Sequence, residues 1–302
     1  MRPLPSPTAS QAADFREDLV ESHGAQLYVR RAGGEAAGAD VLLAVHGGPG
    51  LSHGPLADLE ALASPDLAVV NYDQRGVGRS SGVVDAGDVL GQALADLRAV
   101  RRWSGGAAVH VLGHSWGGLL TAVYAAEHPE EVASVTMVDS VPPTATALDV
   151  AFVTYRERIR SYQARGLVPG DLPGAKEDPV GRALALLPIY FVDPAHPAAR
   201  SMDGARLAPA VMAAHRGFLS SYDVRDSISR VVAPSLHFIA PVPFGPAMAT
   251  TMADAMPASR GRRVRMEDAG HLPWVERPAA FLAHLRTFLT QAQNPNPKGP
   301  KP

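Results

Sequence analysis

The chain has 302 residues, and 46% of them are apolar, so it is long enough to bury a sizeable core. Its formal net charge is -2 and it has no basic stripe, which argues against nucleic-acid and anionic-membrane partners. The absence of cysteine excludes disulfides, iron–sulfur clusters, thiolate zinc sites and cysteine nucleophiles. No apolar stretch approaches a membrane span, and residues 1–14 lack the apolar region of a secretory signal, so we expect a soluble, cytoplasmic protein.

The predicted elements begin after a flexible N-terminus, residues 1–14. Alternating side chains in residues 17–23 and 26–31 predict an antiparallel hairpin. Short apolar runs then alternate with helical patterns, and these runs lie at 41–45, 67–72, 109–112 and 135–138. Unbroken apolar runs of this kind are typical of strands covered on both faces, so the pattern predicts a mostly parallel sheet between two layers of helices.

The alternation stops near residue 141 and resumes near 231. The intervening residues 141–230 are rich in proline and contain three helical patterns, at 152–165, 180–187 and 209–219. We interpret them as a helical lid inserted into a core that comprises residues 15–140 and 231–291. The second part of the core is predicted to contain strands at 234–239 and 262–266 and helices at 246–256 and 278–291, followed by a disordered, proline-rich tail, 292–302.

Residues 113–117 read Gly-His-Ser-Trp-Gly and lie between a predicted strand and a predicted helix. In such a nucleophile elbow the sharp turn exposes a serine hydroxyl at the end of the sheet, and the glycines avoid steric clashes. Ser115 is therefore the candidate nucleophile. A serine hydroxyl needs a base, and His271, on the loop after the last predicted strand, is the candidate for that role.

Acyl transfer also requires backbone N–H groups that stabilise an oxyanion. One donor is expected at Trp116, directly after the nucleophile. The second is expected in the segment His46-Gly47-Gly48-Pro49-Gly50, which follows the 41–45 strand; we assign it to Gly48, with Gly47 as the alternative.

Three motifs together resemble the prolyl aminopeptidase (proline iminopeptidase) branch of the α/β-hydrolase superfamily. They are His-Gly-Gly-Pro-Gly at 46–50, Asp-Gln-Arg-Gly-Val-Gly-Arg-Ser at 73–80 and Gly-His-Ser-Trp-Gly-Gly at 113–118. The resemblance implies an α/β-hydrolase fold with an eight-stranded, mostly parallel sheet, and acyl hydrolysis more firmly than peptide cleavage. For Asp73 and Arg75 we expect a structural role beneath the active-site loops.

In this family an aspartate completes a catalytic triad with the serine and the histidine. The sequence departs from the family pattern here, because Pro243 stands where the family carries that aspartate. Asp139, at the end of the 135–138 strand, is our assignment, because a carboxylate on that neighbouring strand end can reach the histidine. The alternatives are that Asp139 caps the first turn of the lid, that the acid is Asp268, or that no acid exists; Asp254 lies too far along its helix.

The sequence predicts a serine hydrolase acting on an ester, amide, lactone or short peptide. The alternatives are an acyltransferase or cyclase, or a non-hydrolytic ligand-binding or acid–base protein of the same fold. The lid lacks the family's Trp-Glu pattern for binding a free amine, and we interpret its charged residues, including Arg156, Arg158 and Arg160, as a solvated face. Because the lid is otherwise apolar, an apolar small-molecule substrate is favoured over a peptide.

The sequence indicates no cofactor and no metal. Its eleven histidines include no H-E-x-x-H spacing, and Gly76-x-Gly78 lacks the third glycine of a dinucleotide fingerprint. The sequence does not predict the oligomeric state.

Overall fold

The structure is a computed structural model that describes residues 15–200, 204–258 and 261–293. The N-terminal segment predicted to be flexible, residues 1–14, lies outside the described residues. So does most of the tail predicted to be disordered, of which only residues 292 and 293 are described, at the end of the last helix.

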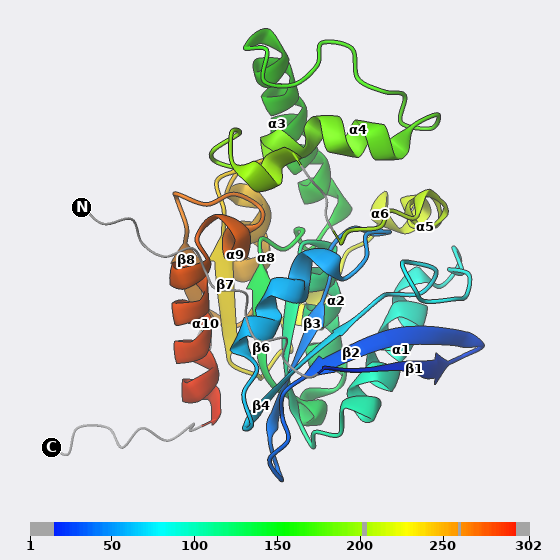
Figure 1. The fold of residues 1–302 in the computed structure, drawn as a ribbon, viewed down its shortest axis with the longest axis vertical. Helices are drawn as coiled ribbons and strands as arrows, with labels where there is room; N and C mark the ends of the chain where they lie inside the picture. The colour runs from blue at the N-terminus through cyan, green and yellow to red at the C-terminus, as the bar shows by residue number, and fades with distance from the viewer. Residues whose placement is uncertain (1–14, 201–203, 259–260, 294–302) are drawn as a thin grey trace, which may run out of the picture.

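An eight-stranded sheet forms the centre of the molecule, as predicted (Figure 1). Its spatial order is β1-β2-β4-β3-β5-β6-β7-β8. The first two strands form the predicted hairpin and β2 pairs antiparallel with β4, whereas all other neighbours are parallel. The bounds are β1 Phe15–Ser22, β2 Ala25–Ala32, β3 Asp40–Val45, β4 Leu67–Tyr72, β5 Val109–His114, β6 Val132–Val138, β7 Ser235–Ile239 and β8 Gly261–Arg265.

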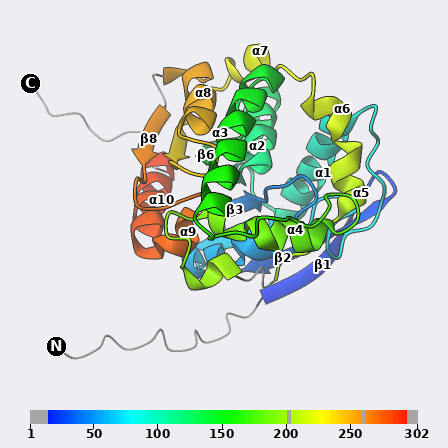
Figure 2. The same cartoon turned by 90° about the horizontal axis from the view of Figure 1, so that it is seen from above.

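Helices cover both faces of the sheet, and each face has its own apolar core (Figure 2). In β3, Leu43 and Val45 pack on one side and Leu42 and Ala44 on the other, which explains why the strand is an unbroken apolar run. The first face is covered by α1 (Val89–Ser104), α2 (Trp116–Glu127) and α8 (Ala247–Ala255); the second by η1 (Gly54–Leu62), α9 (Pro273–Glu276) and α10 (Pro278–Gln293). A short 3-10 turn, η2 (Pro129–Glu131), follows α2.

The register of the parallel strands brings three strand ends together. His114 of β5 lies opposite Val138 of β6, and Val138 lies opposite Phe238 of β7. The residues that follow these strands, Ser115 and Asp139 among them, are therefore neighbours at the carboxyl edge of the sheet.

A helical insert, residues 141–230, separates β6 from β7, and its helices α3 and α4 form the top of the molecule in Figure 1. Its described residues contribute no strand to the sheet. Its elements are α3 Ala145–Ala164, α4 Pro179–Leu186, η3 Leu187–Tyr190, η4 Pro197–Arg200, α5 Pro209–Ala214, α6 Arg216–Leu219 and α7 Arg225–Ile228.

The prediction of one helix over 209–219 is wrong at its middle, because the structure divides it into α5 and α6 at His215. The imidazole Nδ1 of His215 bonds the carbonyl of Val211 at 2.8 Å, and this is the carbonyl that the backbone N–H of His215 also uses, at 3.3 Å. The side chain of His215 thus bonds the backbone of its own preceding turn, and Gly217 in the next turn lowers the helix propensity further, so the helix is weak at this point.

Two buried histidines are expected to make the fold sensitive to acid. Burial lowers the pKa of both His46 and His237 to about 4, below the usual 6.5. Unfolding therefore takes up protons below about pH 6.5, and stability is lost as the pH falls from there toward 4. For each histidine, the unfolding free energy is expected to decrease by about 2 kcal/mol when the pH is lowered from 7.5 to 5.

Urea denaturation of His237→Gln at these two pH values tests this expectation. The variant is expected to lose about 2 kcal/mol less than the wild type between the two pH values, whatever its stability at pH 7.5. An equal loss in both proteins would show that His237 does not contribute.

Candidate active site

Ser115 occupies the sharp turn between β5 and α2, with φ 53° and ψ -117°. This left-handed backbone is rare for a residue with a side chain and marks strain at a functional turn. The flanking glycines are required: a Cβ on Gly113 would lie 2.2 Å from the carbonyl oxygen of Gly117, and one on Gly117 would lie 2.1 Å from that of Val45. The local structure is that of a nucleophile elbow.

His271 lies on the loop between β8 and α9, and its Nδ1–H donates to Oδ2 of Asp139 at 2.5 Å. Asp139 directly follows β6 and also has a left-handed backbone, with φ 43°. Both side chains are buried, with exposed fractions of 6% for His271 and 2% for Asp139. The structure thus brings together the histidine and the carboxylate that the sequence analysis assigned.

The other carboxylates considered for this role do not contact His271. Asp268 pairs with Arg277 at 2.7 Å, and Asp254 pairs with Arg263 at 2.7 Å. The loop after β7, which carries Pro243, contributes no carboxylate but contacts Asp139 through its backbone: the N–H of Ala240 donates to Oδ1 of Asp139 at 3.4 Å.

The backbone of His271 is held from two sides by contacts that the sequence analysis missed. Its N–H donates to the carbonyl of Tyr190 in the insert at 2.8 Å, and its carbonyl accepts from Nε2 of His114 at 3.0 Å. Burial, followed by the nearby His271, lowers the pKa of His114 well below its usual range, so that ring stays neutral. His114, the second residue of the elbow motif, therefore ties the nucleophile turn to the histidine loop.

Glu276 in α9 makes a second tie between this loop and the insert. Its Oε2 accepts from the N–H of Gly270 at 2.5 Å, and its Oε1 accepts from Val192 N at 2.9 Å and Asp193 N at 3.3 Å. A buried carboxylate satisfied by three backbone donors fixes the segment before His271.

The two candidate oxyanion donors lie beside the elbow. Trp116 is the first residue of α2, where N–H groups have no partner within the helix, and its N–H bonds no other residue of the described chain. A Cβ on Gly47 would lie 3.1 Å from Cβ of Ser115, so this loop passes directly against the candidate nucleophile. Gly48 has φ 134°, which an L side chain rarely adopts.

The insert packs closely over residues 46–52, the segment that carries the second candidate oxyanion donor. Ala208 N–H donates to Gly50 O at 2.7 Å, and Ser52 N–H donates to Arg206 O at 2.9 Å, so the two segments pair like short strands. The ring of Trp116 packs edge-on against His215 and Phe218, with centroid distances of 5.2 and 5.7 Å.

Aromatic rings surround His271 on the side of the insert. Phe244 and Tyr190 lie 5.5 and 5.6 Å from its ring, and Tyr155 stacks on Phe244 at 5.0 Å. Taken as whole residues, Ser115 is 7% exposed and His271 is 5% exposed. The site is thus largely shielded from water by apolar surface.

The interpretation of Arg158 as part of a solvated face is wrong. This half-buried guanidinium crosses from α3 to η3, where it donates to the carbonyls of Ile189 at 2.8 Å and Phe191 at 2.9 Å. It fixes the segment that carries Tyr190. Arg156 and Arg160 are exposed, as predicted.

The described carboxylates of the insert do not line the site. They lie on its exposed surface; Asp178 caps α4 and Asp223 pairs with Arg225. Asp203 lies outside the described residues. The exposed carboxylates are Asp149, Glu157, Asp171, Glu177, Asp178, Asp193, Asp223 and Asp226.

Asp73 and Arg75 make structural contacts, as expected, but only Asp73 reaches the active-site loops. Its carboxylate accepts from the N–H and Nδ1 of His53, at 2.9 and 2.7 Å, just before η1. Arg75 instead pairs with the buried carboxylate of Asp96 in α1, at 2.6 Å.

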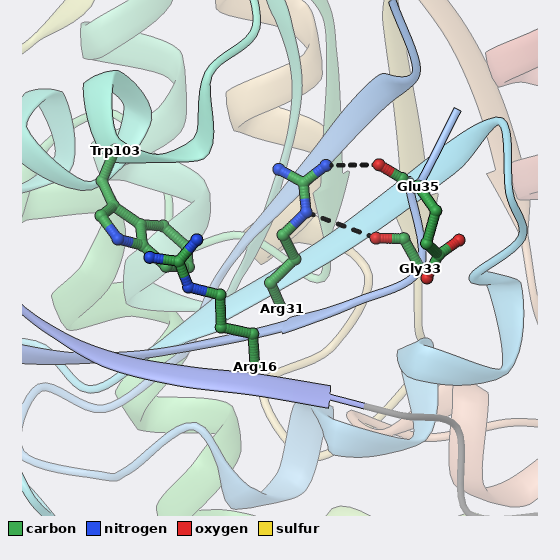
Figure 3. Close-up of a pocket in the computed structure, with 6 residues that line it drawn as sticks. Arg16, Arg31, Gly33, Glu35 and Trp103 are labelled. Atoms are coloured by element: carbon green, nitrogen blue, oxygen red, sulfur yellow. Dashed lines mark hydrogen bonds between the residues drawn. The ribbon is translucent and has the colours of Figure 1, made fainter. Parts of the chain in front are cut away.

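A separate surface pocket of about 310 Å³ lies at the opposite edge of the sheet, beside Arg31 and Trp103 (Figure 3). The guanidinium of Arg31 is engaged there by the carbonyls of Gly33, Gly34 and Ser104. The pocket is remote from Ser115, because these residues lie at the end of β2, just after it, and in the last turn of α1, away from the carboxyl edge of the sheet.

Neither a metal cluster nor a membrane helix is found among residues 15–200, 204–258 and 261–293. No three histidine or acidic side chains there are grouped to hold a metal ion. None of the helices in those ranges has the length and apolar character required to cross a bilayer.

Comparison with known proteins agrees with this architecture. A proline iminopeptidase of Lactiplantibacillus plantarum is 35% identical over 124 residues, which span 39% of this chain and 42% of that protein. One from Lactobacillus helveticus is 27% identical over 304 residues, covering 89% of this chain and 95% of the relative. The chain thus spans less than half of the first relative and nearly all of the second.

The crystal structure of a proline iminopeptidase from Mycobacterium smegmatis has the same fold, with a TM-score of 0.68 and 24% identity over 92% of this chain and 98% of that one. The resemblance inferred from the motifs is therefore confirmed. The family model described as alpha/beta hydrolase fold matches residues 40–278, and the chain accordingly belongs to the α/β-hydrolase family.

Proposed function

We propose that the protein is a serine hydrolase that cleaves an ester, amide, lactone or short peptide through an acyl-enzyme on Ser115. The observation that carries this proposal is the 2.5 Å contact between His271 and Asp139, at the strand end next to the strained elbow. It supplies the orienting carboxylate that a serine–histidine pair needs and that Pro243 cannot supply.

In the proposed reaction, the hydroxyl of Ser115 attacks the carbonyl carbon while Nε2 of His271 takes its proton. Asp139 holds the imidazole in the required tautomer and stabilises the imidazolium. The oxyanion accepts hydrogen bonds from the backbone N–H groups of Trp116 and Gly48, with Gly47 as the alternative. His271 then gives its proton to the leaving group, and a water molecule activated by the same ring releases the acyl group.

The surroundings of His271 favour an uncharged, apolar substrate. The rings of Tyr155, Tyr190 and Phe244 offer no charge, and the described carboxylates of the insert are exposed. A peptide with a free amine would bury an ammonium group without a partner, which is costly. In this proposal the helical insert acts as a lid.

We expect p-nitrophenyl butyrate to be hydrolysed with a kcat/KM at least about tenfold above that for L-proline p-nitroanilide, a difference worth about 1.4 kcal/mol. Steady-state kinetics on both compounds measure this ratio. Efficient cleavage of the prolyl amide with little esterase activity would contradict the apolar substrate class, and no turnover of either would count against hydrolysis.

Acyl transfer is the second candidate function, and the low exposure of Ser115 and His271 favours it, because a shielded acyl-enzyme meets little water. Product analysis with added butanol or butylamine distinguishes the two. A butyl ester or amide formed in excess over the free acid would favour transfer, and free acid alone would favour hydrolysis.

A further inference from the structure

Gln74, two residues beyond β4, joins the two segments that carry the candidate oxyanion donors. Its Nε2 donates to the backbone carbonyl of His46 at 2.8 Å, and its Oε1 accepts from the indole N–H of Trp116 at 3.1 Å. Because an indole N–H only donates, the orientation of the Gln74 amide is fixed.

The ring of His46 completes this connection. Its Nε2 accepts from the backbone N–H of Gln74 at 2.9 Å, so the proton of the neutral ring lies on Nδ1, which donates to the carbonyl of Gly47 at 2.9 Å. The ring is 1% exposed, and its low pKa keeps it neutral at physiological pH.

These bonds orient two successive peptide groups. In a trans peptide the C=O and the following N–H point in opposite directions. With the carbonyl of His46 held by Gln74, the N–H of Gly47 points away from Gln74; with the carbonyl of Gly47 held by the His46 ring, the N–H of Gly48 points away from that ring. Glycine peptides alone would reorient easily, so the directions of both candidate donors depend on these bonds.

We propose that Gln74 is a positioning residue that, together with His46, holds the Gly47–Gly48 segment and Trp116 in the arrangement that stabilises the oxyanion. The inference rests on the proposed function. Gln74 does not touch the substrate in this account; it acts through the backbone groups that do.

Gln74→Met tests the role directly, because it keeps the length of the side chain and removes every hydrogen bond of the amide. Loss of a complete oxyanion donor costs about 100- to 1,000-fold in kcat, so misdirected donors are expected to lower kcat for p-nitrophenyl butyrate about 10- to 100-fold. KM is expected to stay within about threefold, since these contacts matter mainly in the transition state.

Gln163→Met is the matched control. Its amide also bonds backbone carbonyls, those of Pro169 and Gly170, but in the insert and away from the elbow. The kcat of this variant is expected to stay within about twofold of wild type, an effect near the scatter of surface substitutions.

Gln74→Glu makes the pH dependence of kcat a test of the role, because a merely structural role of Gln74 would not change that dependence. Ionised, the introduced carboxylate repels the carbonyl of His46; protonated, its hydroxyl can donate to that carbonyl. Burial raises the pKa of such a carboxyl, so the ratio of variant to wild-type kcat is expected to rise as the pH falls from 8 to 5.

A kcat within twofold of wild type in Gln74→Met, or a pH-independent ratio in Gln74→Glu, would overturn the inference. If Gln74→Met fails to fold, Trp116→Phe, which removes the indole donor and keeps an aromatic ring at this buried position, is expected to lower kcat several-fold, and unchanged kcat would be the contrary result. Ser115→Ala is assayed alongside. If this variant remains active, the proposed function is rejected. If activity is lost in Ser115→Ala but unchanged in the Gln74 variants, only this inference is rejected.

Discussion

Replacement of Ser115 by alanine is expected to lower kcat for p-nitrophenyl butyrate by about 10,000-fold or more, to the level left by binding and the oxyanion donors. The reason is chemical: without the hydroxyl no acyl-enzyme forms, and His271 has no proton to accept. The side chain makes no capping hydrogen bond in α2, so the fold is expected to persist. Steady-state kinetics with a thermal melt measure both effects.

Ser134→Ala is the control for this experiment. Ser134 is a buried serine of β6 whose hydroxyl bonds His110 at 2.8 Å, remote from the elbow. We expect its kcat to remain within about threefold of wild type, the scale of a substitution that touches no reacting group. A Ser115→Ala enzyme that keeps a tenth of the activity would require another nucleophile or non-covalent chemistry.

Asp139→Asn is expected to lower kcat by about 10,000-fold, because the amide favours the histidine tautomer that cannot accept the serine proton. The change is nearly isosteric, and asparagine tolerates the left-handed backbone found at this position, so folding is expected to be preserved. Kinetics and a thermal melt of the purified variant test the assignment.

Asp268→Asn is the matched comparison, because Asp268 is three residues from His271 in sequence but pairs with Arg277 and is 66% exposed. Its kcat is expected to change by less than about twofold. If Asp139→Asn were as active as Asp268→Asn, the buried pair with His271 would be structural.

The layered fold was predictable because strands such as β3 are buried on both faces and therefore leave an unbroken apolar signal. The position of Ser115 was predictable because the tight turn around it requires glycine at 113 and 117, where a Cβ would clash with backbone oxygen atoms, and this requirement is visible in the sequence. Asp139 was harder. The sequence placed it at a strand end, but whether its carboxylate met His271 depended on the register of β6 and β7 and on the path of the loop after β8.

The contacts that the sequence did not predict join segments far apart in the chain. Arg158 resembles any charged residue of an exposed helix, and only its approach to η3 makes it a buried donor. Gln74, His114 and Glu276 likewise act through backbone groups of other loops, which leave no periodic or spacing signal. Only Gln74 and His114 lay within motifs, and those motifs did not indicate their partners.

The most direct test of the account is the site of covalent modification. The protein is treated with a fluorophosphonate, digested, and analysed by mass spectrometry, with Ser115→Ala and Asp139→Asn treated in parallel. We expect one phosphonyl group on the peptide that contains Ser115, no adduct in Ser115→Ala, and much slower labelling in Asp139→Asn. A folded wild-type protein that remains unlabelled, or that is labelled elsewhere, would contradict it.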